Sequence, residues 1–139
     1  MRPYEIIEHT ADIGIKATGR TLEELFEHMA EGMFSLIAPP EEIRPQVTLS
    51  IEAHAEEEDL LLLAWLRELL YLFDTQRVVG KSFKVQRLDS HRIRGTVSGE
   101  KLDLTRHSVD KEVKAVTYCD LSLAQGPDGV WSAQVIFDI

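Results

Sequence analysis

Carboxylates near the two ends of the sequence could bind a metal ion. Asp12 interrupts a run of apolar residues in the segment HTADIGIKATG, and Asp138 directly precedes Ile139, the last residue of the sequence. The Asp138 side chain and the α-carboxylate of Ile139 are adjacent anions, which repel each other unless a cation or hydrogen-bond donors compensate. Hard cations such as Ca²⁺ and Mg²⁺ prefer oxygen ligands of this kind. By itself the pattern also fits a solvated strand end and a turn aspartate that binds nearby backbone amides.

Two histidines and the single cysteine are the other residues with catalytic potential. His9 and His107 could each be a metal ligand, a catalytic base or a hydrogen-bonded side chain. Cys119 is the only cysteine, which excludes an internal disulfide and a multi-cysteine zinc site, and we expect it to be a small buried apolar residue. The sequence has no glycine-rich phosphate loop, no nucleophile elbow and no His-Glu zinc motif.

The composition is typical of one soluble domain. The 139 residues carry a net charge of −9, with sixteen acidic and five basic residues in 1–74 and eight acidic and ten basic residues in 75–139. This balance argues against a protein that is itself the main grip on a nucleic acid, which requires a basic surface. No apolar run reaches the length of a membrane span, and the first residues lack the apolar core of a signal peptide. We therefore expect a cytoplasmic protein.

A small basic stretch stands out against this acidic background. Its members are Lys81, Lys84, Arg87, Arg92 and Arg94. We interpret them as the solvated faces of two strands. A weak contact to RNA or to an acidic partner is the alternative.

Two helices are predicted by apolar periodicity and end signals. The first, in residues 21–40, starts with the capping-box pair Thr21 and Glu24 and continues as an amphipathic stripe that two prolines end. The second, in residues 56–74, starts with four acidic residues, which we interpret as a favourably charged helix start rather than a metal site. Its body is apolar almost all round, which predicts burial between a sheet and the first helix or under a partner.

The remaining segments are predicted to be strands. They cover residues 4–9, 13–19, 46–55, 81–88, 91–99, 112–125 and 130–139. A hairpin is expected around Asp89 and Ser90, and the turn sequence GPDG is expected to pair the last two strands antiparallel. Alternation places Asp138 on the more polar face of the last strand. This order predicts one α+β domain over residues 1–139, a two-layer sandwich with a mixed or antiparallel sheet and both helices on one face.

Four collinear segments resemble the archease family. They are EHTADIGIKATG near the start, AWLRELLYLFD in the middle, EVKAVTY and the terminal VIFDI. One departure is that Cys119 occupies a position where the family commonly has histidine, as TYC in place of TYH. The resemblance implies a fold of the strand-helix-strand-strand (SHS2) type elaborated with extra strands.

The resemblance also implies a function. Archeases are accessory proteins of the GTP-dependent RNA ligase that seals the halves of spliced tRNA. They promote guanylylation of the ligase and its multiple turnover, and they bind a divalent metal that is usually calcium. The implied partner of this chain is therefore that ligase, with at most weak direct contact to RNA and none to a membrane.

The resemblance carries site residues over to this sequence. Asp12, Asp138 and Ile139 match the family's metal ligands, and Lys114 matches a position implicated in function. With His9, Lys114 is a candidate contact to the partner or to phosphate. Because Ca²⁺ takes about 6–8 oxygen ligands, three protein groups would leave positions open for water or for groups of the ligase.

Two other classes of function remain open on the sequence alone. One is a metal-dependent phosphoester hydrolase that uses Asp12 and Asp138 as ligands and His9 or His107 as the base. The other is a general RNA-binding or chaperone-like module for tRNA-processing enzymes, against which the net charge of −9 argues.

Overall fold

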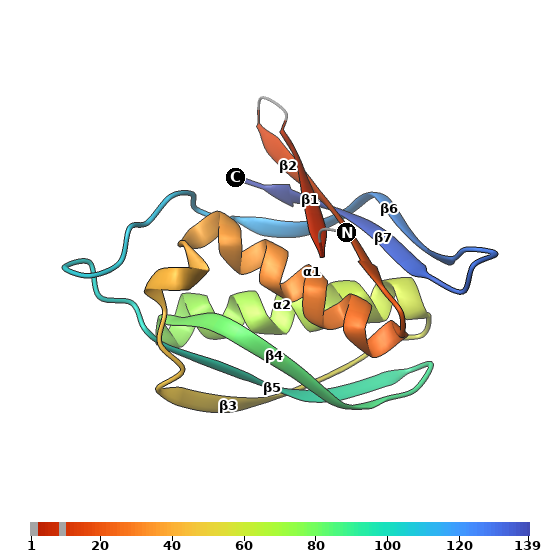
Figure 1. Ribbon diagram of the computed structural model, residues 1–139, viewed down its shortest axis with the longest axis horizontal. Helices are drawn as coiled ribbons and strands as arrows, with labels where there is room; N and C mark the ends of the chain where they lie inside the picture. Colours follow the sequence, from red (N-terminus) through yellow and green to blue (C-terminus); the bar gives the residue numbers. More distant parts are fainter. Residues whose placement is uncertain (1–2, 9–10) are drawn as a thin grey trace.

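Seven strands and two long helices make up the computed structural model, which describes residues 3–8 and 11–139 (Figure 1). The elements in chain order are β1 (Tyr4–Glu8), β2 (Asp12–Gly19), α1 (Leu22–Ile37), a short 3-10 helix (Pro40–Glu42), β3 (Val47–His54), α2 (Glu58–Gln76), β4 (Val78–Leu88), β5 (Arg92–Lys101), β6 (Ala115–Gln125) and β7 (Trp131–Asp138).

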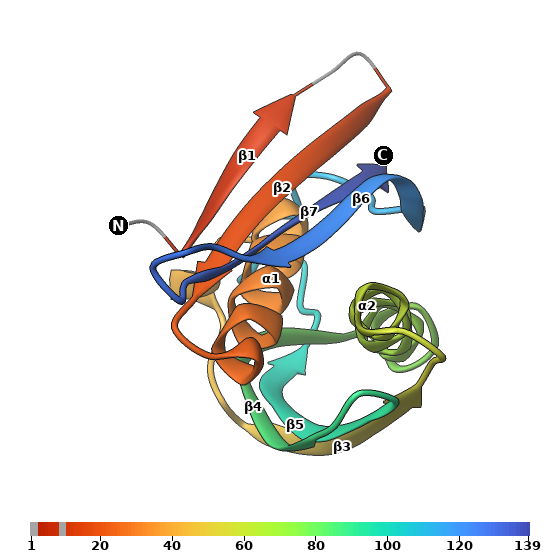
Figure 2. The same cartoon turned by 90° about the vertical axis from the view of Figure 1, so that its right-hand side faces the viewer.

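The predicted α+β class is confirmed, with both helices and with antiparallel pairing throughout the described strands. The strands form two sheets where one was expected: β1-β2-β7-β6 and β3-β5-β4. Both helices lie between the two sheets, so the molecule has three layers (Figures 1 and 2). The reason is the apolar character of the helices, since a helix that is hydrophobic on several sides must be covered on several sides.

Helix α1 begins and ends where its sequence signals predict. The Thr21 side chain accepts a hydrogen bond from the Glu24 amide at 3.1 Å, which caps the first turn. At the other end, the carbonyls of Leu36 and Ile37 would lack helical partners, and they accept bonds from the amides of Lys111 and Asp110 at 3.0 and 2.9 Å. The loop between β5 and β6 is thereby tied to the end of α1.

Helix α2 connects the layers through buried polar contacts. The Trp65 ring is fully buried and donates from Nε1 to the carbonyl of Phe26 in α1 at 3.1 Å. Arg67 donates from Nε and Nη2 to the carbonyl of Val116 in β6, at 3.1 and 2.9 Å. These bonds hold α2 against α1 and against the four-stranded sheet. In the described part of the chain, neither helix is long and apolar enough to cross a membrane.

Both predicted hairpins are confirmed, β4 with β5 and β6 with β7. The expectation of a buried Cys119 is wrong, because this side chain is exposed. The pairing of β6 with β7 shifts between Thr117 and Ser122, and Asp120 within this bulge has a positive φ of 52°. A bulge breaks the alternation of inward and outward side chains from which the burial of a strand residue is inferred.

Candidate metal-binding corner

The ends of β2 and β7 bring together the carboxylates that the sequence singled out. Asp12 lies directly opposite Asp138 in the antiparallel β2–β7 pair. Residues opposite each other in such a pair share a face, with Cβ atoms about 4.5–5.5 Å apart. Ile139 follows, and its amide donates to the carbonyl of Ala11 at 3.5 Å, a long bond that keeps the last residue along β2. We call Asp12, Asp138 and Ile139 the acidic corner.

The acidic corner has the electrostatics of a cation site. Asp138 is exposed and Asp12 is half-buried, and neither carboxylate forms an ion pair within residues 3–8 and 11–139. Like charges directly opposite in a sheet are destabilising, so a divalent cation would stabilise this arrangement. The described residues contain no cluster of three His, Cys, Asp or Glu side chains that could hold a metal ion. A site here would therefore need a ligand besides these side chains, and the family resemblance implies that it comes from Ile139.

An apolar row borders the acidic corner, and sequence reasoning missed it. Gly14 and Ile136 are the next outward-facing pair of β2 and β7. A Cβ at Gly14 would lie 3.0 Å from Cδ1 of Ile136 and 3.7 Å from Cβ of Ile7, so glycine lets both isoleucines close over β2. The available signals were a glycine inside a strand and one isoleucine on the polar face of the last strand. The row reduces water on one side of the carboxylates, which strengthens their interactions with charge.

The backbone of Lys114 lies beside the acidic corner. Its amide donates to the carbonyl of Asp138 at 2.8 Å, and its side chain is exposed. The main chain at Lys114 thus extends the pairing of β6 with β7 to the tip of β7. His9, the other predicted contact, lies outside the described residues.

His107 is a hydrogen-bonded structural histidine. Its ring is fully buried, its Nδ1 accepts from the Asp103 amide at 2.9 Å, and its Nε2 donates to Glu100 at 2.8 Å. Burial opposes ionisation of Glu100, but bonds from the Arg44 amide, His107 and Arg106 outweigh it and lower the pKa of Glu100 from 4.5 to about 2. This cluster holds the β5–β6 loop against β5, and a buried ring cannot reach a substrate.

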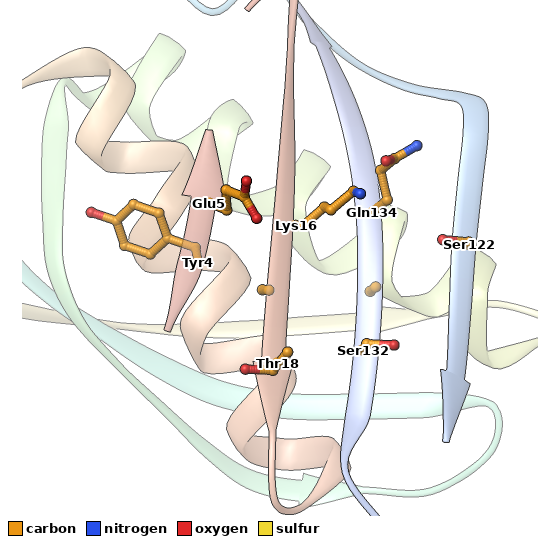
Figure 3. A pocket seen from close by; sticks show the side chains of 9 residues that line it. Tyr4, Glu5, Lys16, Thr18, Ser122, Ser132 and Gln134 are labelled. Carbon is orange, nitrogen blue, oxygen red and sulfur yellow. The ribbon is translucent and has the colours of Figure 1, made fainter. Parts of the chain in front are cut away.

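A broad depression lies on the outer face of the four-stranded sheet, further along the same strands (Figure 3). It encloses about 690 Å³ and is lined mainly by polar side chains. Lys16 lies opposite both Glu5 in β1 and Gln134 in β7. Its row lies four residues from the Asp12 row, or about 13 Å along a strand. The depression is therefore a polar surface beside the corner and does not share its carboxylates.

Two antiparallel sheets around two helices, with carboxylates gathered at adjoining strand ends, define a small α+β domain with a candidate cation site. The Archease protein family (MTH1598/TM1083) matches residues 4–139, and the chain belongs to this family. It is 44% identical to the archease of Pyrococcus furiosus and 37% identical to that of Thermococcus gammatolerans, each over the full length of both chains. The solution structure of Methanobacterium thermoautotrophicum protein 1598 superposes with a TM-score of 0.84, at 33% identity and full coverage of both chains.

Proposed function

We propose that this chain is a metal-binding accessory protein that activates the GTP-dependent RNA ligase of tRNA splicing in the cytoplasm. It would promote guanylylation of the ligase and its multiple turnover without itself joining RNA. Membership of the archease family supports this class of function. The observation that carries the proposal is the placement of Asp12 directly opposite Asp138, next to Ile139.

The proposal assigns the metal to the acidic corner. Carboxylate oxygens of Asp12, Asp138 and Ile139 are hard donors of the type that Ca²⁺ takes, and they supply fewer ligands than the ion needs. A bound divalent cation would supply positive charge for oxygen atoms of the partner or of a phosphate group. The residues of the chain hold that charge at an exposed tip, where a second protein can reach it.

Neighbouring residues would shape the contact with the ligase. The apolar row of Ile7, Gly14 and Ile136 offers a water-excluding border next to the acidic corner. Lys114 offers an exposed positive charge on the β6 side. A charged centre with an apolar border is the arrangement that strengthens electrostatic contacts at protein interfaces. We assign the docking surface to this corner, with Lys114 as a contact to the ligase or to phosphate; His9 is a candidate for the same role from the sequence alone.

The activator proposal is tested with the cognate ligase. The ligase, GTP and divalent metal are incubated with and without this chain, and formation of the ligase–GMP adduct is followed. We expect a faster guanylylation and more than one round of RNA sealing per ligase. No acceleration by the folded protein would refute the proposal.

The metal assignment has a separate test by calorimetry. Titration of the chain with Ca²⁺, Mg²⁺ and Mn²⁺ should show one saturable site, and removal of Asp138 and Ile139 should abolish it while the fold is retained. If the shortened chain binds metal unchanged, the corner is not the site. Metal-dependent phosphoester turnover by the isolated chain, lost in Asp12→Ala, would instead favour a hydrolase.

A further inference from the structure

The outer face of the three-stranded sheet carries a cluster of arginines that the acidic corner does not use. Arg94 in β5 lies directly opposite Arg87 in β4, and directly opposite Glu52 in β3. Arg92 is two residues away on the same face of β5, where it lies opposite His54. Adjacent outward residues of neighbouring strands are within reach of each other. We call Lys84, Arg87, Arg92 and Arg94, all exposed, the basic face.

The positive charges of the basic face are only partly neutralised by the protein itself. Arg87, Arg92 and Arg94 take part in no ion pair within the described residues. Glu52 and Asp89 line the same cavity of about 180 Å³ as the three arginines. However, one oxygen of Asp89 already accepts bonds from the amides of His91 and Arg92, at 2.8 and 2.9 Å. Like charges opposite each other cost free energy, which an anion between Arg87 and Arg94 would offset.

The residues around the arginines indicate which anion fits. Along the same outward face, two rows of hydroxyls cross the sheet, and Thr48 and Ser98 are bonded at 2.9 Å. Arginine forks and Ser or Thr hydroxyls are the groups that contact nucleic-acid phosphates. Apart from His54, the outward positions of β3, β4 and β5 carry no aromatic residue for base stacking, and they form no apolar groove for a peptide.

We infer that the basic face binds the phosphate backbone of an RNA strand without reading its sequence. The whole chain carries a net charge of −9, so the rest of its surface repels RNA, whereas the basic face attracts it. In Figure 1 the β4–β5 turn lies at the lower right and the C-terminus at the upper left, with the helices between them. RNA bound to the basic face would therefore lie on the opposite side of the protein from the acidic corner. The choice of RNA as the polyanion rests on the proposed function.

Direct binding tests the inference with two triple variants of equal charge. Arg87→Gln/Arg92→Gln/Arg94→Gln removes three charges from the basic face, and Lys16→Gln/Arg20→Gln/Lys101→Gln removes three exposed charges elsewhere, so each changes the net charge from −9 to −12. Binding of a fluorescent mixed-sequence RNA hairpin is measured by anisotropy from about 50 to 200 mM salt.

We expect the wild type to bind the hairpin at low salt. The basic-face variant should lose about tenfold or more in affinity, and its log–log salt slope should be shallower by about 2–3, since each phosphate contact contributes 0.7–0.9. The control variant should lose less affinity and keep its slope. Absence of saturable wild-type binding at about 50 mM salt, or equal losses in the two variants, would overturn the inference.

Guanylylation without RNA separates this inference from the proposed function. The basic-face variant should stimulate ligase–GMP formation as well as the wild type does, because no RNA takes part in that step. If it loses this stimulation, the basic face binds the acidic surface of a protein and the RNA inference is wrong. If the wild type gives no stimulation, the proposed function fails, and the hairpin measurement still decides the RNA inference.

Discussion

Asp12 and Asp138 occupy the position in a sheet where two like charges interact most strongly. Each is the terminal residue of its strand, and they face each other across the β2–β7 ladder. The sequence showed one anionic pair, Asp138 with Ile139, and singled out Asp12 separately, but only the family resemblance joined Asp12 to that pair. Strand pairing cannot be read from local spacing, because Asp12 and Asp138 are separated by almost the whole chain.

Replacing Asp138 by asparagine should change stability in opposite directions with and without metal. In chelator, Asp138→Asn should raise the free energy of unfolding by about 0.2–1 kcal/mol, because it removes a like-charge pair. With Ca²⁺ at about 100 times its Kd, the free energy of unfolding should rise by about 2.7 kcal/mol in the wild type and by clearly less in the variant. Thermal unfolding under both conditions measures the two effects.

Glu56→Gln is the matched control for this experiment. Glu56 is an exposed carboxylate in the turn before α2, outside the acidic corner. This variant should keep the full gain from Ca²⁺. If Ca²⁺ stabilises Glu56→Gln as little as it stabilises Asp138→Asn, the net charge of the protein, and not the acidic corner, determines the response to metal.

Glu100 predicts a pH-dependent effect on stability. Its pKa is lowered from 4.5 to about 2 in the folded protein, so its ionised form stabilises the fold fully above pH 4.5, and this contribution is lost as the pH falls from 4.5 toward 2. Glu100→Gln should therefore destabilise the protein most near neutral pH, and the difference from the wild type should shrink below pH 4.5. Urea unfolding of both proteins over this range checks the sign. A difference that is constant with pH would contradict it.

At the scale of elements, residue patterns predicted the helices and strands but not their division into two sheets. Alternation along β7 shows that one face is apolar, and this was correct for Val135 and Phe137, which are buried. Alternation does not say which strand is the neighbour, so both helices were expected on one face of a single sheet. The β6 bulge was also invisible to the sequence, because it depends on the pairing with β7.

The close approach of β4 to β5 depends on a glycine. A Cβ at Gly99 would lie 1.9 Å from the carbonyl oxygen of Val79, a backbone atom that cannot turn away. Gly99→Ala should therefore lower the free energy of unfolding by about 1–3 kcal/mol or more, as overpacking does. Gly126→Ala is the control, since the nearest atom to its Cβ is the end of the Asp128 side chain, which can rotate. Urea denaturation compares them, and equal losses would contradict this account of the strand pair.

At the scale of the whole molecule, opposite charges gather on opposite layers. The acidic corner lies at one end of the two central strands of the four-stranded sheet, and the basic face covers the three-stranded sheet, with both helices between them (Figure 2). The sequence showed a more acidic first half and a more basic second half. The acidic corner and the basic face, however, form only when strands that are distant in the sequence pair. If both proposals hold, this separation would let one small domain present a cation to a protein and a positive surface to RNA.

The isolated chain should be inactive toward the substrates of the ligase. We expect neither joining of RNA ends nor GTP hydrolysis when the purified protein is incubated with divalent metal and each substrate. One physical reason is that His107, one of the two histidines considered as a catalytic base, is bonded to Glu100 and closed to solvent. Turnover that increases in proportion to the protein and persists after further purification would contradict this expectation.

The most direct test of the central claim is the rate of ligase guanylylation with the Asp138→Asn variant. The ligase is incubated with GTP and metal, and the wild type, Asp138→Asn and Glu56→Gln are added at equal concentration. The acidic corner predicts that the wild type and Glu56→Gln accelerate adduct formation equally and that Asp138→Asn loses most of the acceleration. Full acceleration by a folded Asp138→Asn protein would contradict the claim that this corner activates the ligase.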